Sequence, residues 1–237
     1  MTAMIHAAWL HDHGNDADAL TASLNEYQRL LGTLDGVERT GAYLIDPGGA
    51  DMQWVKSTVA HLEGHPAQTQ RPSAFVVAEI MSMPTALALG GQLSTSDGPA
   101  DQDSQPFGIF SQALFHEIAY ISGPQEEPAG PLGDAVQLGT FSVKTVRDEW
   151  RLSEWYEYTR HVEVATIPGA IRTRRLVSIC GHAKFGVLYE FTSLQARLEG
   201  FEKPMEGRFQ DPSHPTSQLG HYTVHAPGAP YVGSKLA

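Results

Sequence analysis

The chain has 237 residues, with 16 Lys and Arg against 27 Asp and Glu, a formal net charge of −11 and a single cysteine. This acidic balance excludes non-specific binding to nucleic acid or an anionic membrane, and one cysteine excludes an internal disulfide and a cysteine-rich zinc site. The apolar fraction of 41% can supply a core, while the 11 histidines are an unusually high number beside 16 Lys and Arg. Histidine titrates near neutral pH and binds metals, so these residues are candidates for acid–base or metal chemistry.

The chain begins MTAMIHAAWLHDHG, without the basic segment that opens a signal peptide. Its apolar runs stay well short of the roughly 18 residues that a membrane span needs. We therefore expect a soluble, cytoplasmic protein whose partner is a small-molecule substrate, with no nucleic acid and no membrane.

The first half alternates strand-like and helix-like segments. Apolar periodicity predicts a strand at 4–10, a helix at 16–34, strands at 41–45 and 74–80, a short helix at 84–89 and a strand at 115–122. The long helix carries one apolar stripe, formed by Leu20, Leu24, Tyr27, Leu31 and Leu34. Residues 90–106 are polar and rich in Gly and Ser, which predicts a flexible loop.

An insertion of about 47–72 interrupts this pattern. It carries Met52, Val55, Val59 and Leu62 at helical spacing, so we expect a short helix in it. Two interpretations stay open: a tolerated surface insertion, or a lid over a pocket, since long loops in compact domains are often functional.

The second half begins after a Gly- and Pro-rich linker at 126–138. Strands are predicted at 139–146, 174–180, 185–191 and 220–225, with helices at 147–166 and 194–198. Leu152, Trp155, Thr159 and Val162 form the stripe expected on the longer helix. The ending HAPGAPYVGSKLA is typical of an extended tail.

Three short segments of the first half recur in the second in the same order. GVERT at 36–40 resembles GAIRT at 169–173, AEIMSM at 78–83 resembles YEFTSL at 189–194, and HEIAY at 116–120 parallels HYTVH at 221–225. This predicts a duplication in which each half has the β-α-β-β-α-β order of a ferredoxin-like unit. The fold class is α+β, with one repeat at 1–125 and the other at 139–237.

Residues 149–198 resemble the dimeric α/β-barrel superfamily, near its EthD-like and antibiotic-biosynthesis-monooxygenase-like groups. The matching features are Trp155-Tyr156, His161, Pro168-Gly169, a basic strand start at 172–175, and KFGVLYE at 184–190. One departure is that His161 lies one residue further from the Trp-Tyr pair, and one nearer to Pro-Gly, than is usual. The resemblance implies a barrel within one chain, a small-molecule pocket between sheet and helices, and a possible homo-oligomer.

Activities known in that superfamily include cofactor-free oxygenation of aromatic polyketides, lactone isomerisation, ring-closing dehydration and haem chemistry. The fold therefore does not choose the reaction.

Five residues are candidates for catalysis. The resemblance singles out His161, whose neutral imidazole would act as a general base, and Tyr156, as an oxyanion donor or a core residue. His221 and His225 lie four apart on a predicted strand, so their side chains would share a face that lines a pocket, binds a metal or lies at the sheet interface. His6 opens the densest histidine cluster, HAAWLHDH, which lacks a recognised metal motif and is also compatible with a solvated loop.

Common nucleotide-binding and hydrolase motifs are missing, and the remaining notable residues favour structural roles. The sequence has no GxGxxG after a strand, no P-loop and no GxSxG elbow. Cys180 follows an apolar run and is interpreted as a packed hydrophobe rather than a nucleophile. Glu79 and Glu190 occupy equivalent repeat positions, and we expect them to form structural ion pairs with Arg39 and Arg172.

These observations together favour a cofactor-independent enzyme that uses general acid–base chemistry on a small cyclic or aromatic metabolite, in a lyase, dehydratase, isomerase or oxygenase step. No cofactor and no metal is assigned. Two alternatives remain: a metal- or haem-dependent enzyme of the same fold, and a non-enzymatic ligand-binding or accessory protein.

Overall fold

The computed structural model describes residues 3–12, 17–45, 52–57, 59–65, 72–95, 107–127 and 129–236. The first half supplies β1 (Met4–Asp12), β2 (Val37–Ile45), β4 (Ala74–Ile80) and β5 (Phe107–Ser122), and the second half supplies β6 (Ala135–Val143), β7 (Ala170–Cys180), β8 (Phe185–Phe191) and β10 (Tyr231–Lys235). These strands run in the order β10-β2-β4-β1-β5-β7-β8-β6, and a further pairing of β10 with β6 closes the ring. Each half has the ferredoxin-like strand order, so the expected tandem barrel within one chain is confirmed.

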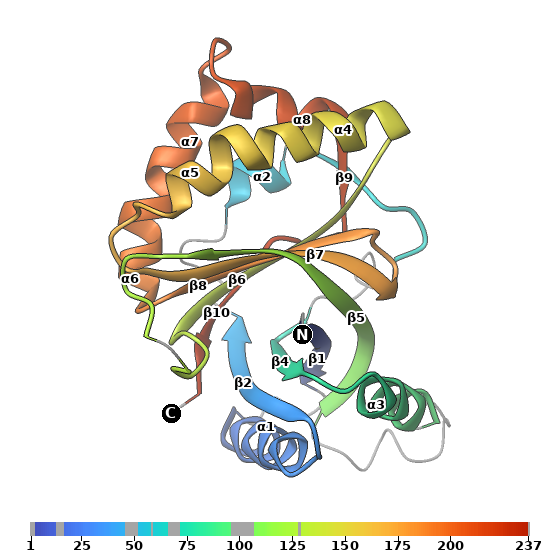
Figure 1. Ribbon diagram of the computed structural model, residues 1–237. Helices are drawn as coiled ribbons and strands as arrows, with labels where there is room; N and C mark the ends of the chain where they lie inside the picture. The colour runs from blue at the N-terminus through green and yellow to red at the C-terminus, as the bar shows by residue number, and fades with distance from the viewer. Residues whose placement is uncertain are drawn as a thin grey trace.

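Helices cover the outside of this barrel on two opposite sides (Figure 1). On the first half lie α1 (Ala17–Gly32) and α3 (Met83–Thr95). On the second half, α4 (Val146–Trp155), the π turn η3 (Tyr156–Arg160) and α5 (His161–Val164) follow one another, as do α6 (Leu194–Arg197), the π turn η4 (Leu198–Glu202) and α7 (Lys203–Gln210). A 3-10 turn, η5 (Pro215–Gln218), and α8 (Leu219–Tyr222) follow. Apolar clusters fill the barrel and the layer beneath each pair of helices.

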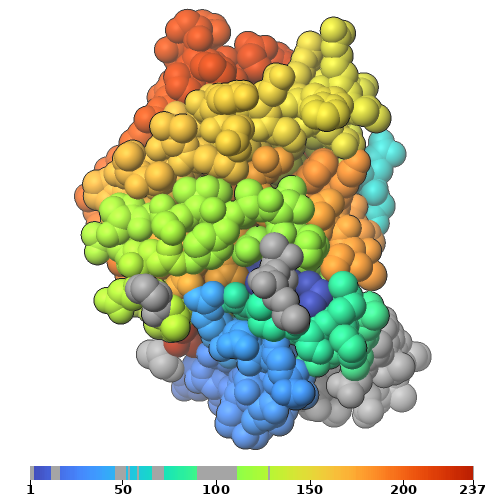
Figure 2. All heavy atoms as spheres, in the orientation of Figure 1, coloured from blue at the N-terminus to red at the C-terminus, as the bar shows by residue number. Residues whose placement is uncertain are grey.

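The insertion of the first half lies against the second half. It contains α2 (Gln53–Lys56) and β3 (Ala60–His61), and β3 pairs in parallel with β9 (Thr223–His225). His65, the last described residue before 66–71, packs on His182 in the turn between β7 and β8, with 4.9 Å between ring centroids. Figure 2 shows this cyan segment beside the orange strands. A segment distant in sequence therefore reaches the face where the second-half helices lie.

Buried ion pairs lie within the barrel, because alternation along β4, β7 and β8 points their charged side chains inward. Arg172 contacts Glu190 (Nε to Oε2, 3.3 Å), and Arg39 contacts Glu79 (Nε to Oε2, 2.5 Å), which confirms the expected pairs. Arg174 joins the two halves by contacting Glu79 at 3.0 Å and Glu190 at 3.5 Å.

The last strand of the second repeat differs from the prediction. Residues 219–222 are helical and only Thr223–His225 is extended, so His221 and His225 do not share a strand face. The fourth ferredoxin strand is instead β10, inside the segment predicted to be a tail. The match of 116–120 with 221–225 is therefore wrong, because β5 corresponds to β10. β10 has only five residues and follows a segment rich in Pro and Gly. Such a short strand gives too little apolar alternation to be predicted from the sequence.

Several smaller predictions also change. Residues 90–95 belong to α3, while 96–106 lie outside the described residues. Cys180 is exposed at the end of β7, so its interpretation as a packed hydrophobe is wrong. Strands β2, β5, β6 and β7 begin before their predicted starts, because their first residues pair with neighbouring strands. Among the described helices, none is long and apolar enough to cross a bilayer.

Removing one partner of a fully buried ion pair should destabilise the barrel strongly. Arg172 has a 1% exposed side chain and Arg39 a 19% exposed one, at equivalent positions of the two repeats. Arg172→Met should lower the free energy of unfolding by about 3 kcal/mol, because the fully buried Glu190 is then left with the more distant Arg174, at 3.5 Å. Arg39→Met is the matched control and should cost clearly less. If urea unfolding showed that both variants lose the same free energy of unfolding, burial would not determine how strongly these ion pairs stabilise the barrel.

Candidate functional site

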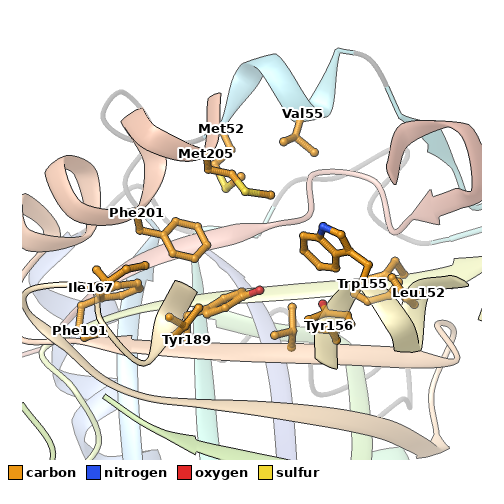
Figure 3. Close-up of a cluster of buried hydrophobic side chains, with 14 of the residues drawn as sticks. Met52, Val55, Leu152, Trp155, Tyr156, Ile167, Tyr189, Phe191, Phe201 and Met205 are labelled. Carbon is orange, nitrogen blue, oxygen red and sulfur yellow. The ribbon is translucent and has the colours of Figure 1, made fainter. Parts of the chain in front are cut away.

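A pocket lies between the outer face of the second-half sheet and the helices above it. About 590 Å³ within it is free of protein atoms, and this figure includes the part open to solvent. Its wall is mainly apolar and aromatic: Met52, Val55, Val59, Phe141, Leu152, Trp155, Val187, Phe201, Met205, Phe209, Leu219 and Pro230. Figure 3 shows Trp155, Phe201 and Met205 placed around the space above Tyr156 and Tyr189.

The insertion forms one wall of this pocket through Met52, Val55 and Val59. Two hydrogen bonds attach its described part to the second half. The backbone N–H of Met52 donates to Glu202 Oε1 at 3.2 Å, and the N–H of Leu62 donates to the carbonyl of His225 at 2.8 Å. The lid interpretation thus has a structural basis: the insertion covers a pocket of the other repeat.

The π turn η3 determines which side chains of the long helix face the pocket. A π turn holds more residues than an α turn, so it rotates the residues after it around the helix axis. Tyr156 and Arg160 are buried, whereas Val162 is 63% exposed. The predicted stripe through Thr159 and Val162 is therefore wrong beyond Trp155.

Three polar side chains of the pocket form a connected chain. Arg160 Nε donates to the hydroxyl of Tyr189 at 3.1 Å, and the Tyr189 hydroxyl is hydrogen-bonded to that of Tyr156. Burial raises the pKa of Tyr156 well above its ordinary value, so this phenol stays protonated and can donate. The two hydroxyls are visible in Figure 3.

His225 brings an imidazole to the pocket from β9. The residue is only partly buried, but its Nδ1 is shielded from solvent and has no partner among the described residues. Burial, with a smaller effect from His61, lowers the pKa of His225 to about 4. The ring is therefore neutral at pH 7, with one nitrogen available to accept a proton or bind a ligand.

The predicted catalytic residues fall in different places. Tyr156 and His225 line the pocket. His161 lies next to it: its ring centroid is 5.6 Å from that of Tyr156, its Nδ1 is 3.6 Å from Glu157 Oε2, and it does not line the pocket. Desolvation by burial lowers the pKa of His161, with a further contribution from Arg175.

His221 and His6 lie elsewhere. His221, exposed on α8, lines a wide cleft beside the pocket, and Trp155 separates the two spaces. The Trp155 indole donates to Thr216 Oγ1 at 3.2 Å. His6 is buried in the first half, 3.3 Å from Gln112 Oε1, and burial lowers its pKa to about 4.

Sequence reasoning missed Arg160, Tyr189 and Gln137, which also line the pocket. Strand alternation could have found Tyr189, because it lies between the inward-facing Leu188 and Glu190. The repeat could have found Gln137, because the strand pairings place it where His6 lies in the first half. Arg160 gave no such signal, because a charged residue is normally exposed and was not counted in the apolar stripe.

In the part of the chain that the structure describes, no three His, Cys, Asp or Glu side chains form a group that could hold a metal ion. His65 and His182 are two neighbouring imidazoles without a third such ligand in that part of the chain.

Comparisons with known proteins agree on the fold alone. No family model and no curated protein matches the chain. A proposed monooxygenase from Fusobacterium nucleatum subsp. nucleatum aligns over 100% of this chain and 93% of its own, with a TM-score of 0.59 and 8% identity. A proposed chlorite dismutase covers 100% and 96% (TM-score 0.56, 10% identity), and an anthrone oxidase-like protein covers 100% and 92% (TM-score 0.56, 8% identity). The similar structures are mostly enzymes with the dimeric α/β-barrel fold.

The neutral His225 should make folding sensitive to acid. Its folded pKa of about 4 lies below the ordinary 6.5, so between these values only the unfolded chain binds the proton, and stability falls as pH decreases. The protonation of His225 alone should lower the free energy of unfolding by up to about 3 kcal/mol between pH 7 and pH 4. His225→Gln should therefore flatten the fall in unfolding free energy, measured by urea unfolding at a series of pH values. His221→Gln, at an exposed position, is the control, and an unchanged slope for His225→Gln would contradict the assignment.

Proposed function

We propose that this chain is a cofactor-independent enzyme that removes a proton from a small, flat, largely apolar cyclic or aromatic metabolite, and that oxygenation by O₂ is the reaction that follows. The observation that carries this is the neutral imidazole of His225, with an unpartnered nitrogen, at an apolar pocket. The fold is compatible with it, since a proposed monooxygenase and an anthrone oxidase-like protein share it. Lyase and isomerase steps have no such support.

The chemistry begins at a ring CH₂ that is acidified by a conjugated ketone. His225 takes one of its protons, and the resulting enolate gives electrons to O₂. Addition of O₂ at this carbon, return of the proton from His225 and loss of water leave a second ketone. The balance is CH₂ + O₂ → C=O + H₂O, so no further reductant or oxidant is needed.

One hydroxyl of the Tyr156–Tyr189 pair would donate a hydrogen bond to the enolate oxygen, while the other donates within the pair. Both are held in place by the buried chain that starts at Arg160, so their orientation costs little reorganisation during the reaction. His161 remains a predicted base without access to the pocket, and we assign it no step here.

An oxygen electrode with anthrone as the substrate tests this proposal. His225→Gln should lower kcat about 100-fold or more, which is the usual contribution of a positioned base. The acid limb of kcat/KM for the unmodified protein should lie near pH 4, because that profile reports the free enzyme and burial lowers the pKa of His225 to about 4. His116→Gln, in β5 of the first half, is the control. Full activity of His225→Gln, or no oxygen uptake with anthrone and related ring ketones, would overturn the proposal.

A haem enzyme is the second candidate, because the same unpartnered nitrogen of His225 could bind iron. If haem bound here, His225 would hold the iron and Arg160 would pair with the haem carboxylates. Bound haem would supply redox chemistry at iron. A Soret shift on titration with haemin, lost in His225→Gln, would favour this candidate over the first, and absence of binding would remove it.

A further inference from the structure

The pocket contains one strong electrostatic feature, Arg160. Among the described residues that line it, Arg160 is the one that carries a full charge, and none is Asp or Glu. Its side chain is 1% exposed, and its Cζ lies 4.0 Å from the ring centroid of Phe201 and 5.1 Å from that of Tyr189. A buried cation therefore lies against the aromatic wall of an otherwise neutral site.

The charge of Arg160 is held in place but not fully balanced. Its Nη1 lies 3.3 Å from Glu163 Oε2, and the same carboxylate oxygen contacts Arg208 Nη1 at 3.0 Å. His214 Nε2 approaches the other oxygen at 3.8 Å. One carboxylate is thus shared between two guanidinium groups. The Nη2 of Arg160 donates to no other described residue.

The other charges around the pocket do not remove this excess. Arg197 and Glu202 form their own pair at 2.6 Å and cancel each other. Arg175 adds a second cation, with its Cζ 4.4 Å from the ring centroid of Tyr156. Glu157 acts on Arg175 and offsets part of this second charge. The cation that is not fully balanced at the pocket wall is therefore Arg160, and at low local dielectric a charge acts more strongly than in water.

From this arrangement we propose that the natural substrate carries an anionic oxygen on its aromatic system, a carboxylate or a phenolate, and that this oxygen binds the guanidinium of Arg160. The inference rests on the proposed function, because it assumes that the aromatic pocket is the substrate site. An anion would accept a hydrogen bond from Nη2, and its ring would pack against the apolar wall. A neutral aromatic compound would leave that donor without a partner.

Matched pairs of probes test the proposal by isothermal titration calorimetry at pH 8. The first pair is 2-naphthoate and 2-naphthamide, and the second is 4-nitrophenolate and 4-nitroanisole. The unmodified protein should bind at least one anion about tenfold or more tightly than its neutral partner, as expected for a charge-assisted hydrogen bond. The two pairs distinguish a carboxylate from a phenolate.

Variants then locate the effect. Arg160→Met should remove the preference for the anion and keep the affinity for the neutral compound. Arg151→Met removes a cation of the neighbouring cleft and should keep the preference, because that residue does not line the pocket. If Arg160→Met does not fold, Arg160→Lys replaces it and should reduce the preference, since lysine lacks the planar donor fork.

The outcomes distinguish failure of the proposed anion preference from failure of the pocket as a ligand site. Equal binding of anion and neutral partner overturns the inference and leaves the aromatic pocket intact. A preference that survives Arg160→Met also overturns it. No binding of any of the four probes overturns both the inference and the pocket on which the proposed function depends.

Discussion

Closure of the barrel by β10 is the constraint on which the rest of the structure depends. A single ferredoxin-like sheet leaves edge strands with unpaired N–H and C=O groups, which favour association with other chains. Here β10 pairs with β2 on one side and β6 on the other, while β5 pairs with β7. Both halves of the chain are therefore needed to satisfy the backbone of either, and the duplication supplies in one chain the edges that would otherwise require a partner.

This closure also decides where a ligand can bind. The inside of the barrel is filled by apolar side chains and by the ion pairs around Arg174, which leaves the outer faces for function. On the first half α1 and α3 pack on the sheet with Leu24 and Leu31 buried. On the second half the equivalent space is widened into the pocket, and the insertion of the first half covers it. In the described part of the chain, the candidate site thus lies on the second repeat.

Within that site, the π turn at Tyr156–Arg160 connects local geometry to chemistry. It places Trp155, Tyr156 and Arg160 together on the buried side, so the aromatic wall and its cation come from one helical segment. β9 adds His225 from the opposite direction. A neutral base and a buried cation thereby line the same apolar pocket, which is the combination expected for forming and stabilising an enolate or phenolate.

The sequence by itself determined the fold class, most elements and the ion pairs, because periodic apolar residues and repeated Arg and Glu positions are local signals. The strands 74–80 and 185–191 were predicted to the residue, and Arg172 with Glu190 followed from the repeat. The inward position of Arg160 is known only from the tertiary structure, because a charged side chain is normally exposed and apolar spacing does not place it in a core. The tertiary structure likewise decided that β10 closes the barrel, since strand pairing is a non-local interaction that a short segment rich in Pro and Gly does not reveal.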